Sequence, residues 1–506
     1  MKSSVIYWIY VPILILCACI IILFTYTSTK TISFPFSLEH SEGVLLYATK
    51  YFENGTLPYK PIIHSPYFVD NYPPVFNCLC ALIRPIFHQP FAPGRFISSA
   101  ALLGIALLLF LWLFAVTKRL LWSIVCGSFF LALPFIFWLV RYYRVDPLAV
   151  FFSILGSYFF IVALKKDRLW IFPIIFFVSG VYTKQSALIA PVSAVVALFF
   201  HQHKKKWFFL TTFLISLLIP AIVLNMVSNG YFLRHIFSYT ITGLKLKGVA
   251  SYIIRLAPLA LFFALAVYFS GMYLVRKVER TIDRTFMVIY FWIAFCSLGL
   301  LFKEGASDLY MLEFTALCIV AGALGADIIF LRASRKLFVY VCVAIQTILL
   351  ASFILPWVSG KNSYMKVTLN YDMLLSRLFV RENKVVSLVK NTQGRVLCED
   401  ISYPVLCGKN PEWVPFIFKQ LHEKGILNDE LIRRDIRAKK FDLIIFETPL
   451  VPVNGQIELK SPHIDRFTTA TIQDILRNYY IIPEKSYIPA VADRMVESKT
   501  VLYPRK

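Results

Sequence analysis

The chain has 506 residues, of which 58% are hydrophobic and only 16% are charged, and its formal net charge is +23. Such a high apolar share excludes an ordinary water-soluble globular protein and fits a chain built mainly of membrane-spanning helices. The positive charge alone would suit nucleic-acid binding, but the positions of the basic residues, given below, exclude that function.

Apolar residues gather in eleven blocks, most of them long enough to cross a hydrocarbon core of about 30 Å as a helix. The first block lacks a small-residue cleavage site, so we expect it to remain as an uncleaved helix. The sequence therefore predicts an all-α polytopic membrane bundle of about 11 transmembrane helices. The blocks are Val5–Thr25, Phe96–Val116, Leu120–Val140, Leu148–Leu164, Trp170–Tyr182, Ser186–Phe200, Phe208–Met226, Ile254–Val275, Phe286–Phe302, Leu309–Leu331 and Leu337–Pro356.

Clusters of Lys and Arg occupy alternate short loops between the blocks, which is the pattern of cytoplasmic loops. We therefore expect a multi-pass protein of the inner (plasma) membrane whose other loops and C-terminal part face the periplasm or the outside. The predicted domains are a transmembrane domain, residues 1–356, and a small exported α/β domain, residues 357–506. In the exported part, Cys398 and Cys407 could form a disulfide or remain two unpaired thiols.

The first external segment, residues 28–93, contains a predicted helix. Leu38–Asn54 has apolar positions at helical spacing, so we expect a helix that lies along the membrane surface. Glu39 and Glu42 are three residues apart and share one face near its start. Two interpretations are open, because these carboxylates could stabilise the helix N-terminus or carry acid–base chemistry.

The same segment continues with Asp70, Asn71 and Tyr72, which precede Pro73-Pro74. The two prolines predict an extended turn before a helix at Val75–Ile86. Asp70 fits a turn or cap residue as well as a binding residue.

Lys184 stands at the centre of Leu169–Phe200, a stretch that is apolar except for Thr183-Lys184-Gln185-Ser186. Both flanks are basic and therefore cytoplasmic, so the chain must cross an even number of times. Two arms of about 14 residues span only about 20 Å each, which is less than the membrane core. We therefore expect a hairpin whose tip holds Lys184 below the outer surface, beside an anion or water, or snorkelling to the surface.

Further charged residues fall on the same external face. Arg144 lies in a very short loop next to Asp146, which also fits a helix N-cap before Pro147. Lys303 opens another external loop, and Tyr310 and Glu313 follow on the next helix. Together these residues predict an outward cavity that suits a phosphate-bearing lipid donor and an acceptor that loses a proton.

At these positions the sequence resembles the GT-C superfamily of polyprenyl-phosphate-dependent glycosyltransferases. Within it, the sequence is similar to the glycosyltransferase family 39-like branch, which is related to protein O-mannosyltransferases and aminoarabinose transferases. The matching pieces follow the family order over most of the chain: Leu38-Glu39-His40-Ser41-Glu42-Gly43, Asn71-Tyr72-Pro73-Pro74, Gly94-Arg95, Arg144-Val145-Asp146-Pro147-Leu148-Ala149, Thr183-Lys184-Gln185-Ser186-Ala187-Leu188 and the strand-like Phe441-Asp442-Leu443-Ile444-Ile445.

The resemblance implies an inverting transfer of a sugar from a polyprenyl-phosphate donor to a glycan, lipid or protein acceptor. It implies that Glu42 matches the catalytic carboxylate best, with Glu39 as the alternative and Asp146 as a second acidic residue. The implied phosphate-binding residues are Arg144, Lys184, Gln185 and Lys303, and the implied substrate-binding residues are Asp70, Asn71, Tyr72, Tyr310 and Glu313. The Glu-x-x-Glu pair departs from the family pattern, which leaves the base and any divalent metal open.

Two other functional classes share the hydrophobic blocks. A transporter or flippase of lipid-linked sugars would show matched inverted halves and charges near the membrane midplane, whereas here the charges favour one face. A non-catalytic membrane scaffold with an exported binding domain is the second alternative, because a fold does not establish chemistry.

Overall fold

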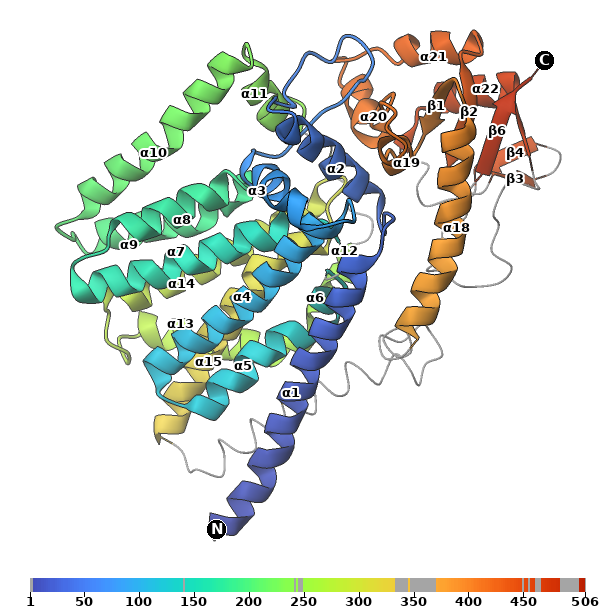
Figure 1. The fold of residues 1–506 in the computed structure, drawn as a ribbon. Helices are drawn as coiled ribbons and strands as arrows, with labels where there is room; N and C mark the ends of the chain where they lie inside the picture. Colours follow the sequence, from blue (N-terminus) through green and yellow to red (C-terminus); the bar gives the residue numbers. More distant parts are fainter. Residues whose placement is uncertain are drawn as a thin grey trace.

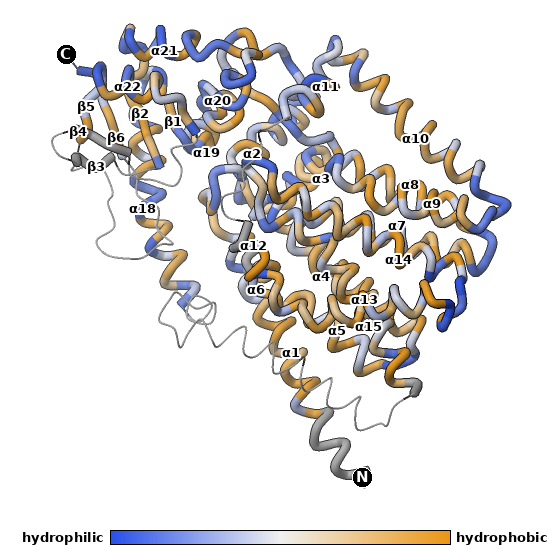
Figure 2. The backbone as a smooth tube through the Cα atoms, turned by 180° about the vertical axis from the view of Figure 1, so that it is seen from behind, coloured by the Kyte–Doolittle hydropathy of each residue, from blue (hydrophilic) through white to orange (hydrophobic). Residues whose placement is uncertain are grey.

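The computed structural model describes residues 3–139, 142–240, 243, 249–332, 345, 370–447, 450–453, 456–459, 466–482 and 500–505. Within these residues, apolar helices form a bundle, and a smaller part with short strands lies beyond one end of it (Figure 1). We call the described residues from 370 onward the C-terminal region. Figure 2 shows that the bundle helices are mainly hydrophobic and that the C-terminal region is richer in hydrophilic residues. The predicted fold class, a polytopic helical bundle with a small α/β part, is confirmed.

Seven helices of the described chain are long and apolar enough to cross a membrane, and four shorter apolar helices accompany them. The chain is therefore a multi-pass membrane protein. The seven are Val11–Ser33, Ala92–Thr117, Asp146–Lys166, Lys206–Val227, Ser251–Leu274, Ile282–Phe302 and Asp308–Phe330. The shorter ones are Val75–Ile86, Leu120–Ala132, Ile171–Val181 and Gln185–Phe200.

The helices of the bundle and of its external loops follow one another in chain order. They are α1 (Ser3–Ser33), α2 (His40–Glu53), α3 (Val75–Ile83), α4 (Ala92–Thr117), α5 (Leu120–Ala132), α6 (Pro134–Leu139), α7 (Asp146–Lys166), α8 (Ile171–Val181), α9 (Ile189–Phe200), α10 (Lys206–Val227), α11 (Tyr231–Leu233), α12 (Val249–Leu256), α13 (Ala260–Leu274), α14 (Ile282–Ser297) and α15 (Leu312–Arg332). Short 3-10 turns at Arg84–Ile86, Gln185–Leu188, Ala257–Leu259, Leu298–Phe302 and Asp308–Met311 and a π turn at Arg234–Ser238 join them.

One predicted span differs from the structure. The block Leu120–Val140 is not one helix, because it is divided into α5 and α6 at Leu133-Pro134. Leu133 has an extended backbone, with ψ of 127°, which is the conformation favoured before proline. The predicted span Leu337–Pro356 and the proposed domain boundary after residue 356 lie outside the described residues, apart from residue 345.

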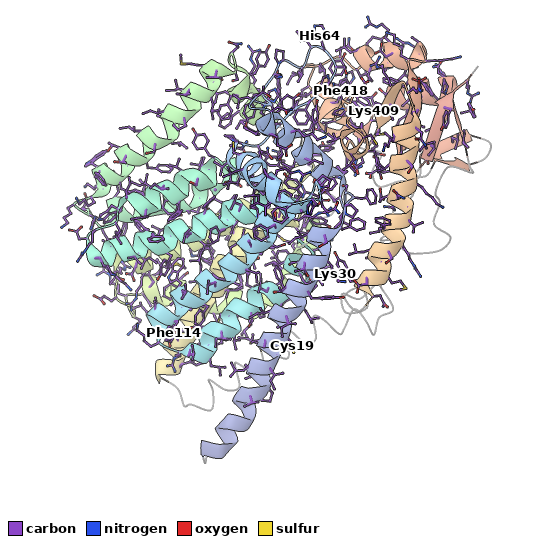
Figure 3. The ribbon with its side chains drawn as sticks, in the orientation of Figure 1. Cys19, Lys30, His64, Phe114, Lys409 and Phe418 are labelled. Carbon is purple, nitrogen blue, oxygen red and sulfur yellow. The ribbon has the colours of Figure 1, made fainter. Side chains whose placement is uncertain are left out.

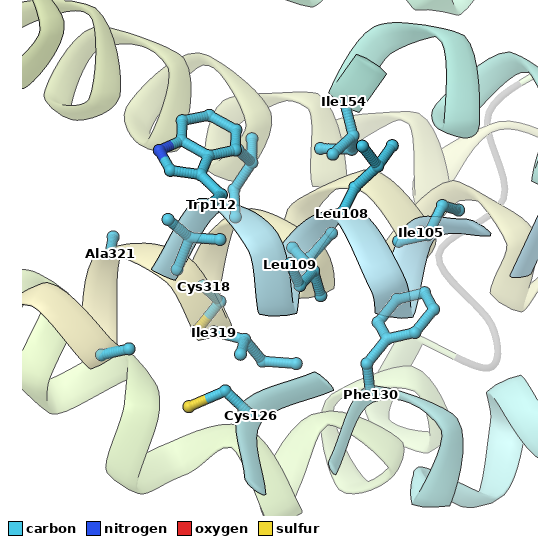
Figure 4. Packing of buried hydrophobic residues seen from close by; sticks show 14 of the residues in the cluster. Ile105, Leu108, Leu109, Trp112, Cys126, Phe130, Ile154, Cys318, Ile319 and Ala321 are labelled. Atoms are coloured by element: carbon cyan, nitrogen blue, oxygen red, sulfur yellow. The ribbon is translucent and has the colours of Figure 1, made fainter. Parts of the chain in front are cut away.

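The bundle core is formed by interlocking aliphatic and aromatic side chains. Figure 4 shows Leu109 and Trp112 of α4 packed among residues of α5 and α15. Both side chains are almost completely buried. Burial of each large apolar side chain stabilises the folded protein by about 1.5–3 kcal/mol. This packing therefore fixes the relative positions of the helix ends.

The helix predicted at Leu38–Asn54 is confirmed as α2, which ends before Gly55, a residue with φ of +66°. Its Gly43 packs directly on the C-terminal region, because a Cβ there would lie 2.5 Å from the backbone nitrogen of Ser402. Lys50 of α2 also donates to the carbonyl of Val405 at 2.6 Å. The segment that contains α2 and the C-terminal region therefore form one continuous layer over the bundle end. Figure 3 shows Phe418 and Lys409 in this layer, with Phe114 and Cys19 towards the opposite end.

The C-terminal region contains a four-stranded sheet in the order β1-β2-β6-β5. Strands β1 and β2 are parallel, with Val396 opposite Leu443, and β6 runs antiparallel to both β2 and β5. The predicted buried strand at Phe441–Ile445 is confirmed as β2. The elements are α18 (Tyr371–Asn391), β1 (Arg395–Cys398), α19 (Ser402–Leu406), α20 (Pro415–Glu423), α21 (Glu430–Arg437), β2 (Phe441–Phe446), β3 (Leu450–Val453), β4 (Gln456–Leu459), α22 (Thr469–Asn478), β5 (Tyr479–Ile481) and β6 (Thr500–Pro504).

The two cysteines singled out in this region are not joined by a disulfide. The thiol of Cys407 instead faces the carbonyl oxygen of Val386 at 3.5 Å. Of the two alternatives left open for Cys398 and Cys407, the structure therefore has the one without the disulfide.

Candidate functional site

A cavity of about 410 Å³ lies between loops at one end of the bundle and the C-terminal region. Its walls therefore come from parts of the chain that are far apart in sequence. The lining residues are Glu39, His40, Ser41, Val44, Leu45, Asn71, Tyr72, Arg144, Asp146, Lys184, Glu304, Gly305, Ala306, Ser307, Leu309, Tyr310, Val414, Phe416, Ile417 and Arg466.

The first turn of α2 separates the two glutamates that the sequence placed on one face. Glu39 is the N-cap residue, and its side chain accepts from the backbone N–H of Ser41. This is the capping interpretation of Glu39, and it is compatible with a place in the cavity lining, where the side chain is 19% exposed.

Glu42, in contrast, is completely buried and is not among the residues that line the cavity. Arg95 binds it with two hydrogen bonds, from Nε to Oε1 at 2.9 Å and from Nη2 to Oε2 at 2.6 Å. The backbone N–H groups of Tyr143 and Leu38 also donate to its carboxylate, each at 2.7 Å. Because every direction is occupied by protein donors, Glu42 joins α2, α4 and the loop before α7 and has no free oxygen for a substrate.

Arg144 connects the loop before α7 to the start of α2. Its Nη2 lies 2.9 Å from Oε2 of Glu39. Its Nε is buried and has no hydrogen-bond partner, so the guanidinium keeps a donor unused. Burial alone would raise the pKa of Glu39, but Arg144 and His40 outweigh it and hold the pKa well below its usual range. Glu39 is therefore held ionised beside Arg144.

Lys184 and Asp146 form a buried ion pair inside the cavity wall. Lys184 lies at the tip of the hairpin between α8 and the Gln185–Leu188 turn and lines the cavity. Its Nζ is bound to Oδ1 of Asp146 and lies 4.1 Å from the ring centroid of Tyr310. Oδ2 of Asp146 is buried without a hydrogen-bond partner.

Asp146 is the first residue of α7, and it does not cap that helix as its position before Pro147 suggested. The N-cap position belongs to Val145, and no side chain caps the helix there. The carboxylate of Asp146 is therefore available for the cavity, since it binds Lys184 through one oxygen only.

The structure brings some of the other predicted site residues to the cavity. Asn71, Tyr72 and Tyr310 line it. Glu313 lies deeper, in a small adjoining cavity that Asp146 and Lys184 also line. The hydroxyl of Tyr290 donates to Glu313 at 2.6 Å.

Three other predicted residues do not line the cavity. Asp70 is completely buried, accepts from the side chain of Asn77 at 3.2 Å, and has a pKa that burial raises to about 7. The side-chain amide of Gln185 donates to the carbonyls of Asn71 and Ile236 at 3.1 and 3.0 Å, so it fastens two loops. Lys303 is half-buried beside the cavity, and burial followed by Lys184 lowers its pKa.

Sequence reasoning missed His40 and the four residues that the C-terminal region contributes, Val414, Phe416, Ile417 and Arg466. Phe416 packs against Gly305, where a Cβ would meet the Phe416 ring at 2.7 Å and where φ is +79°. The glycine at that turn could have signalled a close approach, but nothing in the local sequence names the partner. Among the described residues, no group of three or more His, Cys, Asp or Glu is arranged to hold a metal ion.

The helical bundle and the C-terminal α/β part together have the fold of the GT-C glycosyltransferases. ArnT from Cupriavidus metallidurans, solved bound to undecaprenyl phosphate, matches with a TM-score of 0.60 and 10% identity over 96% of this chain and 97% of that chain. Its apo state also gives a TM-score of 0.60 and 10% identity, over 99% and 98% of the two chains.

The archaeal oligosaccharyltransferase AglB from Archaeoglobus fulgidus matches with a TM-score of 0.54 and 10% identity. That match covers 88% of this chain and 70% of AglB, which was solved with an inhibitory peptide and a dolichol-phosphate. No protein-family model and no curated protein matches the sequence. At these identities the likeness shows the fold, and the chemistry must come from the cavity itself.

Proposed function

We propose that this chain is an integral membrane glycosyltransferase that moves a sugar from a polyprenyl-phosphate donor to an acceptor on the non-cytoplasmic face. One observation carries the proposal. Two cations, Arg144 and Lys184, stand in one cavity beside Asp146, whose Oδ2 lacks a partner. Cations with spare N–H donors suit a phosphate, and an open carboxylate oxygen suits a hydroxyl that must lose its proton.

In the proposed reaction the acceptor oxygen attacks the anomeric carbon while the bond from that carbon to the phosphate oxygen breaks. The polyprenyl phosphate leaves with the bonding electrons, and the configuration at carbon inverts. Arg144 and Lys184 stabilise the charge that develops on the leaving phosphate. The acceptor proton goes to Asp146, and a well-placed base contributes about 10²–10⁴-fold to the rate.

We assign the base to Asp146 and place Glu39 and Glu42 in other roles. Glu39 is bound by Arg144 and His40, each at 2.9 Å, and its low pKa makes it a weak proton acceptor. Glu42 lies outside the cavity lining. The family-based expectation that Glu42 carries the base thus gives way to a proposal in which Glu42 supports the site.

The experiment that tests this function supplies radiolabelled polyprenyl-phosphate sugars and a cell-envelope extract to the purified protein in lipid nanodiscs. Asp146→Asn keeps the size of the side chain but removes the proton acceptor and leaves buried Lys184 without its charged partner, so transfer is compared per folded protein and is expected to fall about 10²-fold or more. Arg433→Met is the matched control, because Arg433 pairs with Asp474 at 2.7 Å within the C-terminal region and does not line the cavity. Absence of transfer by the wild type with every sugar donor would reject the proposal, and near-normal transfer by Asp146→Asn would reject the assigned base.

The proposed orientation places the cavity and the C-terminal region in the periplasm, or outside the cell. It rests on the basic loops at the opposite end, where exposed Lys204 pairs with Asp167. A membrane-impermeant thiol reagent applied to intact spheroplasts is expected to label a cysteine at exposed Lys384 and to spare one at Lys204 until lysis. The reverse labelling would invert the topology.

A further inference from the structure

Two buried carboxylates stand at one edge of the C-terminal sheet. Glu399 directly follows β1 and Glu447 directly follows β2, and because these strands are parallel neighbours both residues emerge at the same edge. The backbone N–H of Glu447 donates to Oε2 of Glu399 at 2.7 Å, which holds the two residues together. The carboxyl ends of parallel strands are the usual place for ligand-directed side chains in α/β domains.

Arg466 joins this edge to the cavity. Its Nη1 donates to Oε1 of Glu399 at 2.9 Å and to Oε2 of Glu447 at 2.8 Å. The residue is 7% exposed and is one of the cavity-lining residues. Two carboxylates fix one end of the guanidinium, so its other nitrogen, Nη2, is directed out of the C-terminal region.

The atom that meets Nη2 is Nδ1 of His40, at 3.3 Å. The same Nδ1 lies 2.9 Å from Oε1 of Glu39, and Oε2 of Glu39 lies 2.9 Å from Nη2 of Arg144. A continuous chain of charged side chains therefore runs from the C-terminal sheet to the cation that we place on the donor phosphate. We call it the Arg466–Arg144 chain, with His40 and Glu39 as its inner members.

We infer that Arg466 is a positioning residue of the cavity that acts through its charge: held by Glu399 and Glu447, it governs the protonation of His40, which when protonated binds the Glu39 carboxylate, and Glu39 in turn holds Arg144. This inference rests on the proposed function. It assigns the C-terminal region a part in donor binding, which explains why the cavity is incomplete without it.

The chemistry of Nδ1 makes this chain depend on a proton. Glu39 only accepts hydrogen bonds, so Nδ1 must carry a hydrogen to bind it, whereas a neutral Nδ1 that accepted from Arg466 would turn a lone pair towards Glu39. Burial acts to lower the pKa of His40, but Glu39 outweighs it and the pKa is raised above its ordinary value, with Arg466 opposing and Glu447 assisting. The charged groups that face the ring are thus Glu39, Arg466 and Glu447.

Removing a positive charge and removing a negative charge near the ring must move the titration midpoint of His40 in opposite directions. Arg466→Met removes a cation, so His40 keeps its proton to higher pH. Glu447→Gln removes an anion, so His40 loses its proton at lower pH. We expect each midpoint to move by about one pH unit, as for an opposite or like charge within a few ångströms.

The experiment measures the titration midpoint of His40 by mass spectrometry of C2–H deuterium exchange in the full-length protein. The variants are Arg466→Met, Arg466→Lys, Glu447→Gln and the control Arg433→Met. Arg466→Lys keeps the charge and is expected to leave the midpoint near that of the wild type, and Arg433→Met is expected to leave it unchanged. If Arg466→Met does not fold, the shift of the His40 midpoint to lower pH in Glu447→Gln still tests the inference.

The second readout is transfer as a function of pH. The alkaline limb is expected to follow the His40 midpoint in each variant, so Arg466→Met moves it to higher pH and Glu447→Gln moves it to lower pH, through the KM for the donor and with little change in kcat. Midpoints that do not move in opposite directions, or an alkaline limb of transfer that does not follow them, would overturn the inference. If the wild type transfers no sugar, the proposed function fails, and the midpoints, which need no activity, decide the charge chain by themselves.

Discussion

Glu42→Gln is expected to destabilise the folded protein by about 3–5 kcal/mol, because it removes the charge that neutralises buried Arg95. Both side chains are completely buried. Arg95 also donates to the carbonyls of Thr31, Phe34 and Phe36 at 2.7–2.9 Å, so it cannot turn away to reach water. A glutamine accepts through one oxygen only and directs its NH₂ group at donors.

The measurement is thermal unfolding and monodispersity of the purified variant in detergent. Glu39→Gln is the matched control: its side chain is 19% exposed, and it is expected to stay folded. The double variant Glu42→Gln/Arg95→Gln places two neutral amides face to face and is expected to recover part of the lost stability. A Glu42→Gln protein that unfolds like the wild type but transfers no sugar would return the catalytic role to Glu42.

The membrane architecture could be predicted from the sequence because each span and each loop carries its own signal. Apolar length, basic loops and the polar centre at Lys184 are local features, and the structure places that lysine at the tip of two short helices. The helix α2 and the strand β2 followed from apolar spacing in the same way. The prediction of a single span at Leu120–Val140 was wrong, because hydropathy does not detect the helix break that Pro134 imposes.

The inner organisation of the site could not be predicted, because it depends on contacts between distant segments. Glu39 and Glu42 look alike at the start of a helix, yet one caps it and the other points inwards to Arg95, 53 residues away in the sequence. His40 and Arg466 are separated by 426 positions, and the sequence around either residue gives no indication that the two are in contact. Periodicity places a side chain on a face of its own helix and leaves open what packs against that face.

Lys184 is the second residue whose replacement should have a large effect. It is buried with Asp146, so Lys184→Ala leaves an unpaired carboxylate and is expected to cost several kcal/mol of stability. Loss of transfer by Lys184→Ala would therefore mix two effects. The two must be separated before Lys184 can be assigned to the phosphate.

The double variant Lys184→Met/Asp146→Asn separates them, because it removes both charges together and leaves no unpaired ion. Its stability is expected to return close to that of the wild type, while its affinity for undecaprenyl phosphate remains weaker by about 1.5–3 kcal/mol, the range for one charge-assisted hydrogen bond.

Asp146→Asn alone removes the base and keeps the lysine, so its affinity for undecaprenyl phosphate should match or exceed that of the wild type. Lys184→Arg should restore part of the affinity, since its donors are directed differently. Lys204→Met is the control, because Lys204 also pairs with an aspartate, Asp167, but in an exposed loop that does not line the cavity. The affinity of each variant is measured by titration of undecaprenyl phosphate with native mass spectrometry. If the stable double variant binds undecaprenyl phosphate as tightly as the wild type, Lys184 is only the structural partner of Asp146.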